Sequence, residues 1–245
     1  MNDPRERKDF SRFLVHLTRN TRGIKAEENL INMLDHRKIE ARNFHCLFGP
    51  KIKKMELTKK LKKSFKTVCF TETPLDQIFK LTVEDFPRRI KLRPYGLVFW
   101  RDVLLEKGAN PAIYINGDGT NLNKYLINEF DRHFKNISAL KGLKNNQEYY
   151  QEIVHYYSLI NLISDRYDFS WEREWRCNGD FKFKYRDIVT IISDSPETFL
   201  EKCHKNLTKN KMNYINRIPI ISSRWGYERV IDEMSEKLWN MRPNK

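Results

Sequence analysis

The stretch at residues 168–176 constrains the fold most, because tryptophans and glutamates alternate along it. If the stretch is a strand with a two-residue period, its side chains divide between two faces. One face carries Phe169, Trp171, Arg173 and Trp175, and the other carries Ser170, Glu172, Glu174 and Arg176. Because the tryptophans must be covered by other parts of the chain, the stretch predicts a strand of a folded core.

The two carboxylates of this strand, Glu172 and Glu174, would lie about 7 Å apart on one face. Like charges at such a separation raise each other's pKa, whereas a nearby guanidinium lowers it, so two such groups need not titrate alike. The pair can serve chemistry. It can also belong to an edge strand whose charges prevent edge-to-edge pairing.

The charge balance favours an anionic partner. The chain of 245 residues carries a net charge of +14, and such an excess typically attracts nucleic acid, nucleotide phosphates or an acidic protein. A composition rich in Lys, Asn and Ile can also reflect an AT-rich genome. The segment 51–66 predicts an amphipathic helix with a cationic face. That face is either simply solvated or contacts DNA or RNA phosphates through Lys59, Lys60, Lys62 and Lys63.

Cysteine spacing and the terminus predict a cytoplasmic protein. Cys46, Cys69, Cys177 and Cys203 form no Cys-x-x-Cys pair, so free thiols in a reducing cytosol are expected and a zinc ribbon is not. The charged residues 1–9 are unlike a signal peptide. Since no apolar run reaches the length of a membrane span, no membrane partner is expected. No His/Cys/Asp cluster suggests a bound metal.

The remaining patterns alternate between strand and helix. Strands are predicted at 10–18, 38–41, 67–75, 95–100, 110–115, 181–185 and 188–193, and the segment 218–221 precedes the closing helix. Helices are predicted at 26–35, 51–66, 101–107 and 226–240, and in two pieces within 121–165. The order predicts one α+β domain over residues 1–245, with a mixed or antiparallel core sheet and a helical insertion at about 121–165.

Several of these motifs, taken in order, resemble the AbiGi family, the antitoxin-designated partner in bacterial abortive-infection systems of phage resistance. They are FLVHLT at 13–18, VCFTETPL at 68–75, YGLVFW at 95–100, GANP at 108–111 and WEREWR at 171–176. The resemblance covers about residues 10–195. It implies a role in phage defence together with a cognate toxin or defence protein, but no particular reaction.

More distantly, the layout resembles the ADP-ribosyltransferase superfamily, including the DarT group that modifies DNA. The resemblance implies an ADP-ribosyltransferase-like core and NAD as substrate, without a metal. His16 would hydrogen-bond the NAD ribose, and Arg12 or Thr18 would hold the phosphates or a ribose. Phe70, or alternatively Tyr95, would stack on the nicotinamide ring.

The same resemblance makes Glu172 or Glu174 catalytic. A fixed carboxylate would stabilise the oxocarbenium-like cation that forms as nicotinamide leaves, and a second would accept the proton of the incoming nucleophile. The match has two departures. The segment from Thr71 to Thr73 only approximates a Ser/Thr-x-Ser motif, and Leu17 replaces a small residue. A pocket with such departures could bind a nucleotide without turnover, or bind nothing.

Three functions therefore follow as hypotheses. The first is an NAD-dependent mono-ADP-ribosyltransferase that modifies nucleic acid or protein. The second is a non-catalytic antitoxin that binds its toxin partner, DNA, or both through its basic surface. The third is a metal-dependent nuclease using Asp168, Glu172 and Glu174. It is disfavoured because the strand lacks a Glu-x-Lys arrangement.

Overall fold

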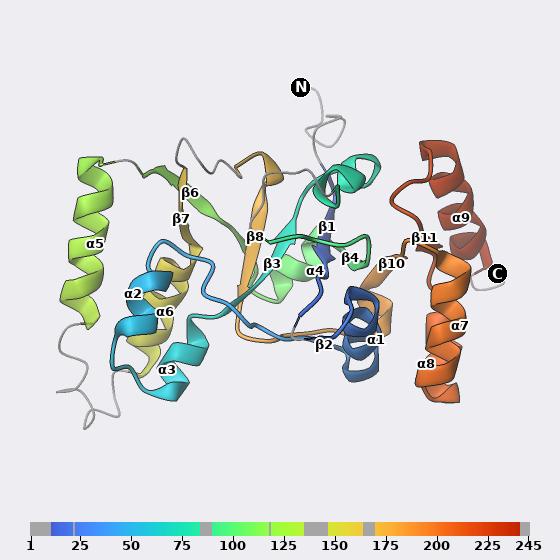
Figure 1. The fold of residues 1–245 in the computed structure, drawn as a ribbon, viewed down its shortest axis with the longest axis horizontal. Coiled ribbons are helices and arrows are strands. Elements are labelled where there is room, and N and C mark those ends of the chain that lie inside the picture. Colours follow the sequence, from blue (N-terminus) through green and yellow to red (C-terminus); the bar gives the residue numbers. More distant parts are fainter. Residues whose placement is uncertain are drawn as a thin grey trace. The chain divides into compact units, whose positions relative to one another are not determined.

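The computed structural model describes residues 11–21, 23–83, 90–117, 119–134, 147–163 and 170–240 (Figure 1). The chain packs into two compact units. Unit 1 comprises Met1–Lys38, Phe70–Glu106 and Lys182–Lys245, and unit 2 comprises Ile39–Cys69 and Lys107–Phe181. A single domain over residues 1–245 stays a prediction. The predicted α+β class with a mixed, mostly antiparallel sheet is confirmed.

The sheet of unit 1 is ordered β11-β10-β4-β1-β3. Its strands are β1 (Phe13–Leu17), β3 (Thr67–Thr71), β4 (Gly96–Trp100), β10 (Ile188–Ile192) and β11 (Ile220–Ile221). β4 runs antiparallel to both β1 and β10, whereas β10 and β11 are parallel. Strand β3 carries the chain from unit 2 into unit 1, because the boundary falls between its residues Cys69 and Phe70.

Side chains of β1 alternate between two faces, as the sequence predicts. Val15 and Leu17 join an apolar cluster with residues of β4, β10 and β11 and with the 3-10 helix η2 (Leu75–Leu81). His16 lies on the opposite face, where its ring is 5.8 Å from that of Phe70. The alternation arises because successive side chains of an extended strand point to opposite faces of the sheet.

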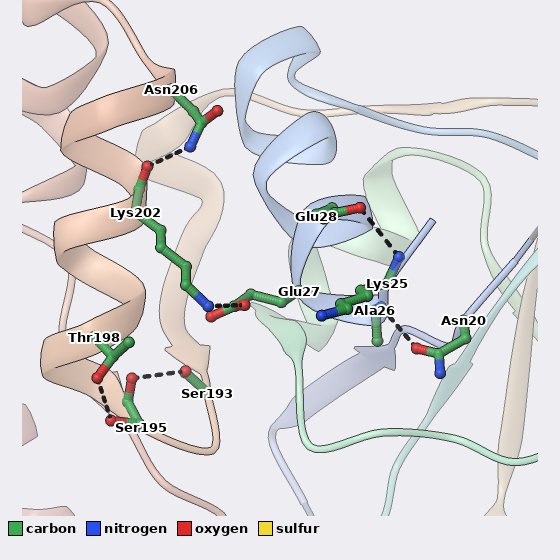
Figure 2. A network of polar contacts seen from close by, with 10 residues as sticks. All are labelled: Asn20, Lys25, Ala26, Glu27, Glu28, Ser193, Ser195, Thr198, Lys202 and Asn206. Atoms are coloured by element: carbon green, nitrogen blue, oxygen red, sulfur yellow. Dashed lines mark hydrogen bonds and ion pairs between the residues drawn. The ribbon is translucent and has the colours of Figure 1, made fainter. Parts of the chain in front are cut away.

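Helices complete unit 1. They are α1 (Ala26–His36), α4 (Arg101–Glu106), α7 (Pro196–Asn206), α8 (Lys209–Ile215), α9 (Tyr227–Asn240) and the 3-10 helix η6 (Tyr185–Asp187). Leu30, Ile31 and Leu34 recur at helical spacing and form the buried side of α1. Figure 2 shows how α1 is held: the Asn20 side chain accepts the Ala26 N–H, and Glu27 pairs with Lys202 of α7.

Unit 2 is built around an aromatic core. Its elements are α2 (Gly49–Lys54), α3 (Lys59–Ser64), β5 (Asn110–Pro111), β6 (Ile113–Asn116), α5 (Asn121–Phe134), α6 (Gln147–Leu159), β7 (Ile160–Ile163), η5 (Ser170–Glu172) and β8 (Glu174–Asn178). β2 (Lys38–Ile39) and β9 (Phe181–Lys182) pair with each other where the two units meet in the sequence. The rings of Phe48 and Phe130 stack with centroids 4.4 Å apart, and Tyr157 lies edge-on to both. These rings belong to the buried cluster against which the helices of unit 2 pack.

Helix boundaries in unit 2 differ from the prediction in two places. The predicted helical region at 121–165 contains α5 and α6, but residues 160–163 form the strand β7, which pairs with β6. The expected single helix at 51–66 is wrong, because α2 and α3 are separated by residues 55–58. The Thr58 hydroxyl accepts the Leu61 N–H at 3.2 Å and starts a new helix. Within the described ranges, no helix is long and apolar enough to cross a membrane.

Candidate functional site

The predicted site residues divide between the two units. Unit 1 contains Arg12, His16, Thr18, Phe70, Thr71 and Tyr95. Unit 2 contains Glu172, Glu174 and the lysines Lys59, Lys60, Lys62 and Lys63. Asp168 lies outside the described residues.

The predicted strand at 168–176 is wrong for residues 170–173, which do not belong to β8. Residues 170–172 form the 3-10 turn η5, closed by the Arg173 N–H, which donates to the Ser170 carbonyl at 3.1 Å. Arg173 then adopts a left-handed conformation with φ 45°, and β8 begins at Glu174. Glu172 therefore lies on a turn, and the strand face that it was expected to share with Glu174 does not extend to it.

Glu174 is held in place by three donors. The Arg176 guanidinium donates to its carboxylate at 2.8 Å, and the Tyr114 hydroxyl donates at 2.9 Å. The Cys69 thiol also hydrogen-bonds to it. The Arg176 side chain is fully buried and donates a second bond, at 2.7 Å, to the Ser158 carbonyl. The two-residue spacing predicted that Arg176 would lie beside Glu174. The other partners could not be predicted, because they belong to distant segments that share no sequence motif with β8.

The charges around Glu174 keep it ionised. Burial alone would raise the pKa of the Glu174 carboxyl, but the charge and hydrogen bond of Arg176 outweigh burial, and the pKa lies below its ordinary value. Burial and the Glu174 charge raise the pKa of the Tyr114 phenol, and they raise that of the Cys69 thiol well above its ordinary value. The arrangement is thus an anionic carboxylate surrounded by a cation and two neutral donors.

Two pairs of predicted cofactor residues lie together in unit 1. The Thr18 N–H donates to the Tyr95 carbonyl at 2.7 Å, and His16 lies beside Phe70. Their rings make a T-shaped contact at 5.8 Å, and Phe70 in turn lies edge-on to Phe99 at 6.1 Å. An imidazole beside an aromatic ring can present a hydrogen-bonding group next to a stacking surface. His16 is half-buried, but Phe70 is only 2% exposed, so little of the Phe70 ring is available for a ligand to stack on.

The two candidates for holding phosphates or ribose, Arg12 and Thr18, flank opposite ends of β1. The Arg12 guanidinium lies 5.5 Å from the ring centroid of Trp100. The Thr18 hydroxyl is buried and donates to the Ala26 carbonyl at 3.0 Å, so its role includes fixing the start of α1. The six-residue separation corresponds to about 20 Å of extended strand, so Arg12 and Thr18 cannot hold the same phosphate.

Tyr95 lines an open pocket of about 680 Å³, together with Phe79, Thr82, Val83, Arg93, Pro94, Asp194 and Arg224. Burial, with the charges of Glu27 and Asp194, raises the pKa of Tyr95. Thr71 is not one of the residues that line this pocket. Its hydroxyl forms a 2.7 Å hydrogen bond with the Thr73 hydroxyl. Only Tyr95 of this pocket was predicted, because the other residues come from separate segments without a shared motif.

The predicted phosphate-contacting lysines belong to α3, and two of them have contacts within unit 2. Lys62 Nζ donates to the Lys53 carbonyl at 3.3 Å, and Lys63 Nζ lies 3.9 Å from Asp180. Lys59 and Lys60 are exposed. No group of three or more His, Cys, Asp or Glu side chains is arranged to hold a metal ion in the part of the chain that the structure describes.

Comparisons with protein-family models, with curated proteins and with solved structures give no match to this chain. Its own residues therefore carry any proposal about its function.

Proposed function

We propose that this chain is a phage-defence enzyme that cleaves NAD and transfers ADP-ribose to a nucleic acid or protein acceptor. The proposal rests on the resemblances to the AbiGi family and, more distantly, to ADP-ribosyltransferases. It also rests on the different surroundings of the two glutamates. In it, Glu172 is the catalytic carboxylate and Glu174 is a positioning residue.

The left-handed Arg173 is the observation that supports this division of roles most directly. A non-glycine residue at φ 45° costs about 1–3 kcal/mol and persists only where the surrounding structure holds it, often at active sites. Here it separates a glutamate on a turn from a glutamate anchored in a strand. Because the charge of Glu174 is compensated by Arg176 at 2.8 Å, we assign Glu174 the positioning role.

The proposed reaction exchanges one bond to the nicotinamide-side ribose for another. The glycosidic bond breaks and its electron pair leaves with nicotinamide, which generates an oxocarbenium-like carbon. The Glu172 carboxylate stabilises this cation. An O–H or N–H group of the acceptor attacks the same carbon, and the proton of that group passes to the Glu172 carboxylate. The resemblance to ADP-ribosyltransferases implies that His16 hydrogen-bonds the ribose and that Phe70 stacks on the nicotinamide ring.

Release of nicotinamide from NAD tests the proposal. Wild type and Glu172→Gln are incubated with NAD and with duplex DNA, single-stranded DNA, RNA or cell protein as acceptor. We expect the variant to release nicotinamide at least about 100-fold more slowly while its melting temperature stays that of wild type. An inert wild type with every acceptor, or equal rates for both proteins, would show that the proposal is wrong.

Binding is measured separately, because His16 and Phe70 are assigned to NAD recognition rather than to bond cleavage. Isothermal titration of the Glu172→Gln protein with NAD gives the affinity without turnover. Adding His16→Ala to that protein should weaken NAD binding by about tenfold, which corresponds to the loss of one hydrogen bond to a polar ligand group. An unchanged affinity contradicts the role of His16.

A further inference from the structure

Half of the chain's excess positive charge lies in one short segment of unit 2. Residues 49–66, which contain α2 and α3, include eight lysines and a single glutamate, a net +7 out of +14 for the whole chain. A segment with this density of one sign repels itself, so it must be held by other forces or balanced by a partner.

Some of these lysines have contacts within the unit. Lys51 forms an ion pair with Asp131, Lys63 lies 3.9 Å from Asp180, and Lys66 lies 6.0 Å from the ring centroid of Phe44. Lys62 donates to the Lys53 carbonyl. The remaining four, Lys53, Lys54, Lys59 and Lys60, are exposed. Among the described residues, the structure gives the ammonium groups of these four lysines no ion pair or hydrogen bond. We call them the lysine cluster.

The lysine cluster is assembled by the break between the two helices. Lys53 and Lys54 end α2, and Lys59 and Lys60 begin α3. The Lys62–Lys53 hydrogen bond links one helix to the other. Ile52 and Phe65 are buried in the aromatic core of unit 2, and Met55, Leu57 and Leu61 pack against it. The apolar side chains thus anchor the segment to the core of unit 2, while the four lysine side chains are exposed to solvent.

We propose that the lysine cluster binds the sugar–phosphate backbone of a nucleic acid. Lysine is a flexible point charge that neutralises phosphates without reading base sequence. Four unpaired lysines on one short segment provide several such contacts at once. The proposal goes beyond the transfer reaction proposed above and does not depend on it, because binding can be measured without NAD.

The composition of the segment argues against two other anionic partners. A membrane-binding segment needs an apolar face to enter the headgroup region, yet residues 49–66 include none of the exposed large apolar side chains of the described chain. Protein interfaces are depleted in Lys and enriched in Arg and aromatic residues, and the lysine cluster has neither. A phosphodiester chain fits the observed side chains best.

Fluorescence anisotropy tests the proposal with labelled duplex DNA, single-stranded DNA and duplex RNA, in salt from about 50 to about 300 mM. One variant replaces Lys53, Lys54, Lys59 and Lys60 with Gln. A matched control replaces Lys182, Lys184, Lys205 and Lys209 of unit 1 with Gln, since these lysines are also exposed. Both variants lose four positive charges. A comparison between them therefore separates the effect of lysine position on affinity from the effect of net charge.

We expect wild type to bind at least one of the three polymers, and the polymer bound most tightly identifies the source of the backbone. The lysine-cluster variant should lose at least tenfold in affinity for the polymer that wild type binds most tightly, at about 100 mM salt. The slope of its log affinity against log salt should be shallower by about 3 to 4. The control should keep the wild-type slope to within about 1. Melting temperatures check that both variants are folded.

Three outcomes would overturn the proposal. Wild type could fail to bind all three polymers at the lowest salt concentration. The two variants could lose affinity equally, which would assign binding to net charge alone. Lastly, the lysine cluster could be needed for binding to vesicles that contain phosphatidylserine, or to polyglutamate as a substitute for an acidic protein, and not be needed for binding to nucleic acids.

Discussion

Glu174 shows how one neighbouring residue decides the state of a buried acid. Its carboxylate stays charged because Arg176 lies two positions along the same strand and donates at 2.8 Å. The sequence predicts this pairing, since side chains two apart on a strand share a face. Tyr114, Cys69 and Ser158 could not be predicted as partners, because only the tertiary fold brings their distant segments to β8.

Replacing Glu174 tests the ion pair. Glu174→Gln leaves the buried Arg176 without an anionic partner, so the free energy of unfolding should fall by about 3–5 kcal/mol. Glu129→Gln is the control, because its partner Arg132 is 73% exposed, and such surface pairs contribute about 0–1 kcal/mol. Urea denaturation of the three proteins measures both effects. Equal losses for the two variants contradict a special role for the buried pair.

The same pair gives the stability a pH dependence. The pKa of Glu174 is lower in the folded protein than its ordinary value of 4.5. Unfolding at lower pH therefore takes up a proton, and the stabilisation is present above the ordinary pKa and disappears as pH falls through the folded value. The stability difference between wild type and Glu174→Gln should be constant from about pH 7 to about pH 6 and narrow below about pH 4. A difference that does not narrow as pH falls below the ordinary pKa of 4.5 contradicts this origin.

At the scale of elements, periodic segments were predictable and interrupted ones were not. β1, β4 and α1 follow their two-residue and three-to-four-residue patterns closely. The segment 51–66 contains neither Gly nor Pro to announce a break; the break occurs because Ile52 and Phe65 both reach one core. The turn before β8 escaped prediction for a related reason. Arginine rarely adopts φ 45°, and only the surrounding fold imposes it.

Pairing between β1 and β4 depends on Gly96. A Cβ atom at Gly96 would lie 2.5 Å from the His16 carbonyl oxygen, which is backbone and cannot move without opening the pair. Gly96→Ala should therefore lower the free energy of unfolding by about 2 kcal/mol or more.

Gly226→Ala serves as the control, since a Cβ at Gly226 meets nothing within 4 Å, and we expect a change within about 0.5 kcal/mol. Guanidinium denaturation midpoints compare the two variants. A Gly96→Ala protein as stable as wild type would mean that β1 and β4 can separate there without cost.

For the whole molecule, the alternation of strands and helices was enough to predict the α+β class, but the two units could not be predicted. The chain passes between them after residues 38, 69, 106 and 181. None of these passages has the Gly-, Pro- or Ser-rich composition of a linker, and three of them fall within the strands β2, β3 and β9. A boundary inside a strand leaves no compositional signal, because strand residues are chosen for pairing and burial.

The four cysteines, distributed over both units, should be unreactive in the folded protein. All are free, and burial raises the pKa of each thiol, to about 12 for Cys203. Because the thiolate is the reactive form, labelling with a disulfide reagent at about pH 8 should be at least about 100-fold slower in native than in urea-unfolded protein. Rapid native labelling of one thiol would contradict the burial of that residue.

The passage of the chain between units also orders events during synthesis. Unit 2 ends at Phe181, so all of its residues exist before the segment that starts at Lys182 is translated. The sheet of unit 1 cannot be completed at that stage, because β10 must still be made to join β4 to β11. Since domains fold as their residues emerge from the ribosome, unit 2 should be closed while β4 still lacks its last partner strand, β10. A ribosome stalled late on this message would therefore carry a finished aromatic core in unit 2 and an open sheet edge at β4.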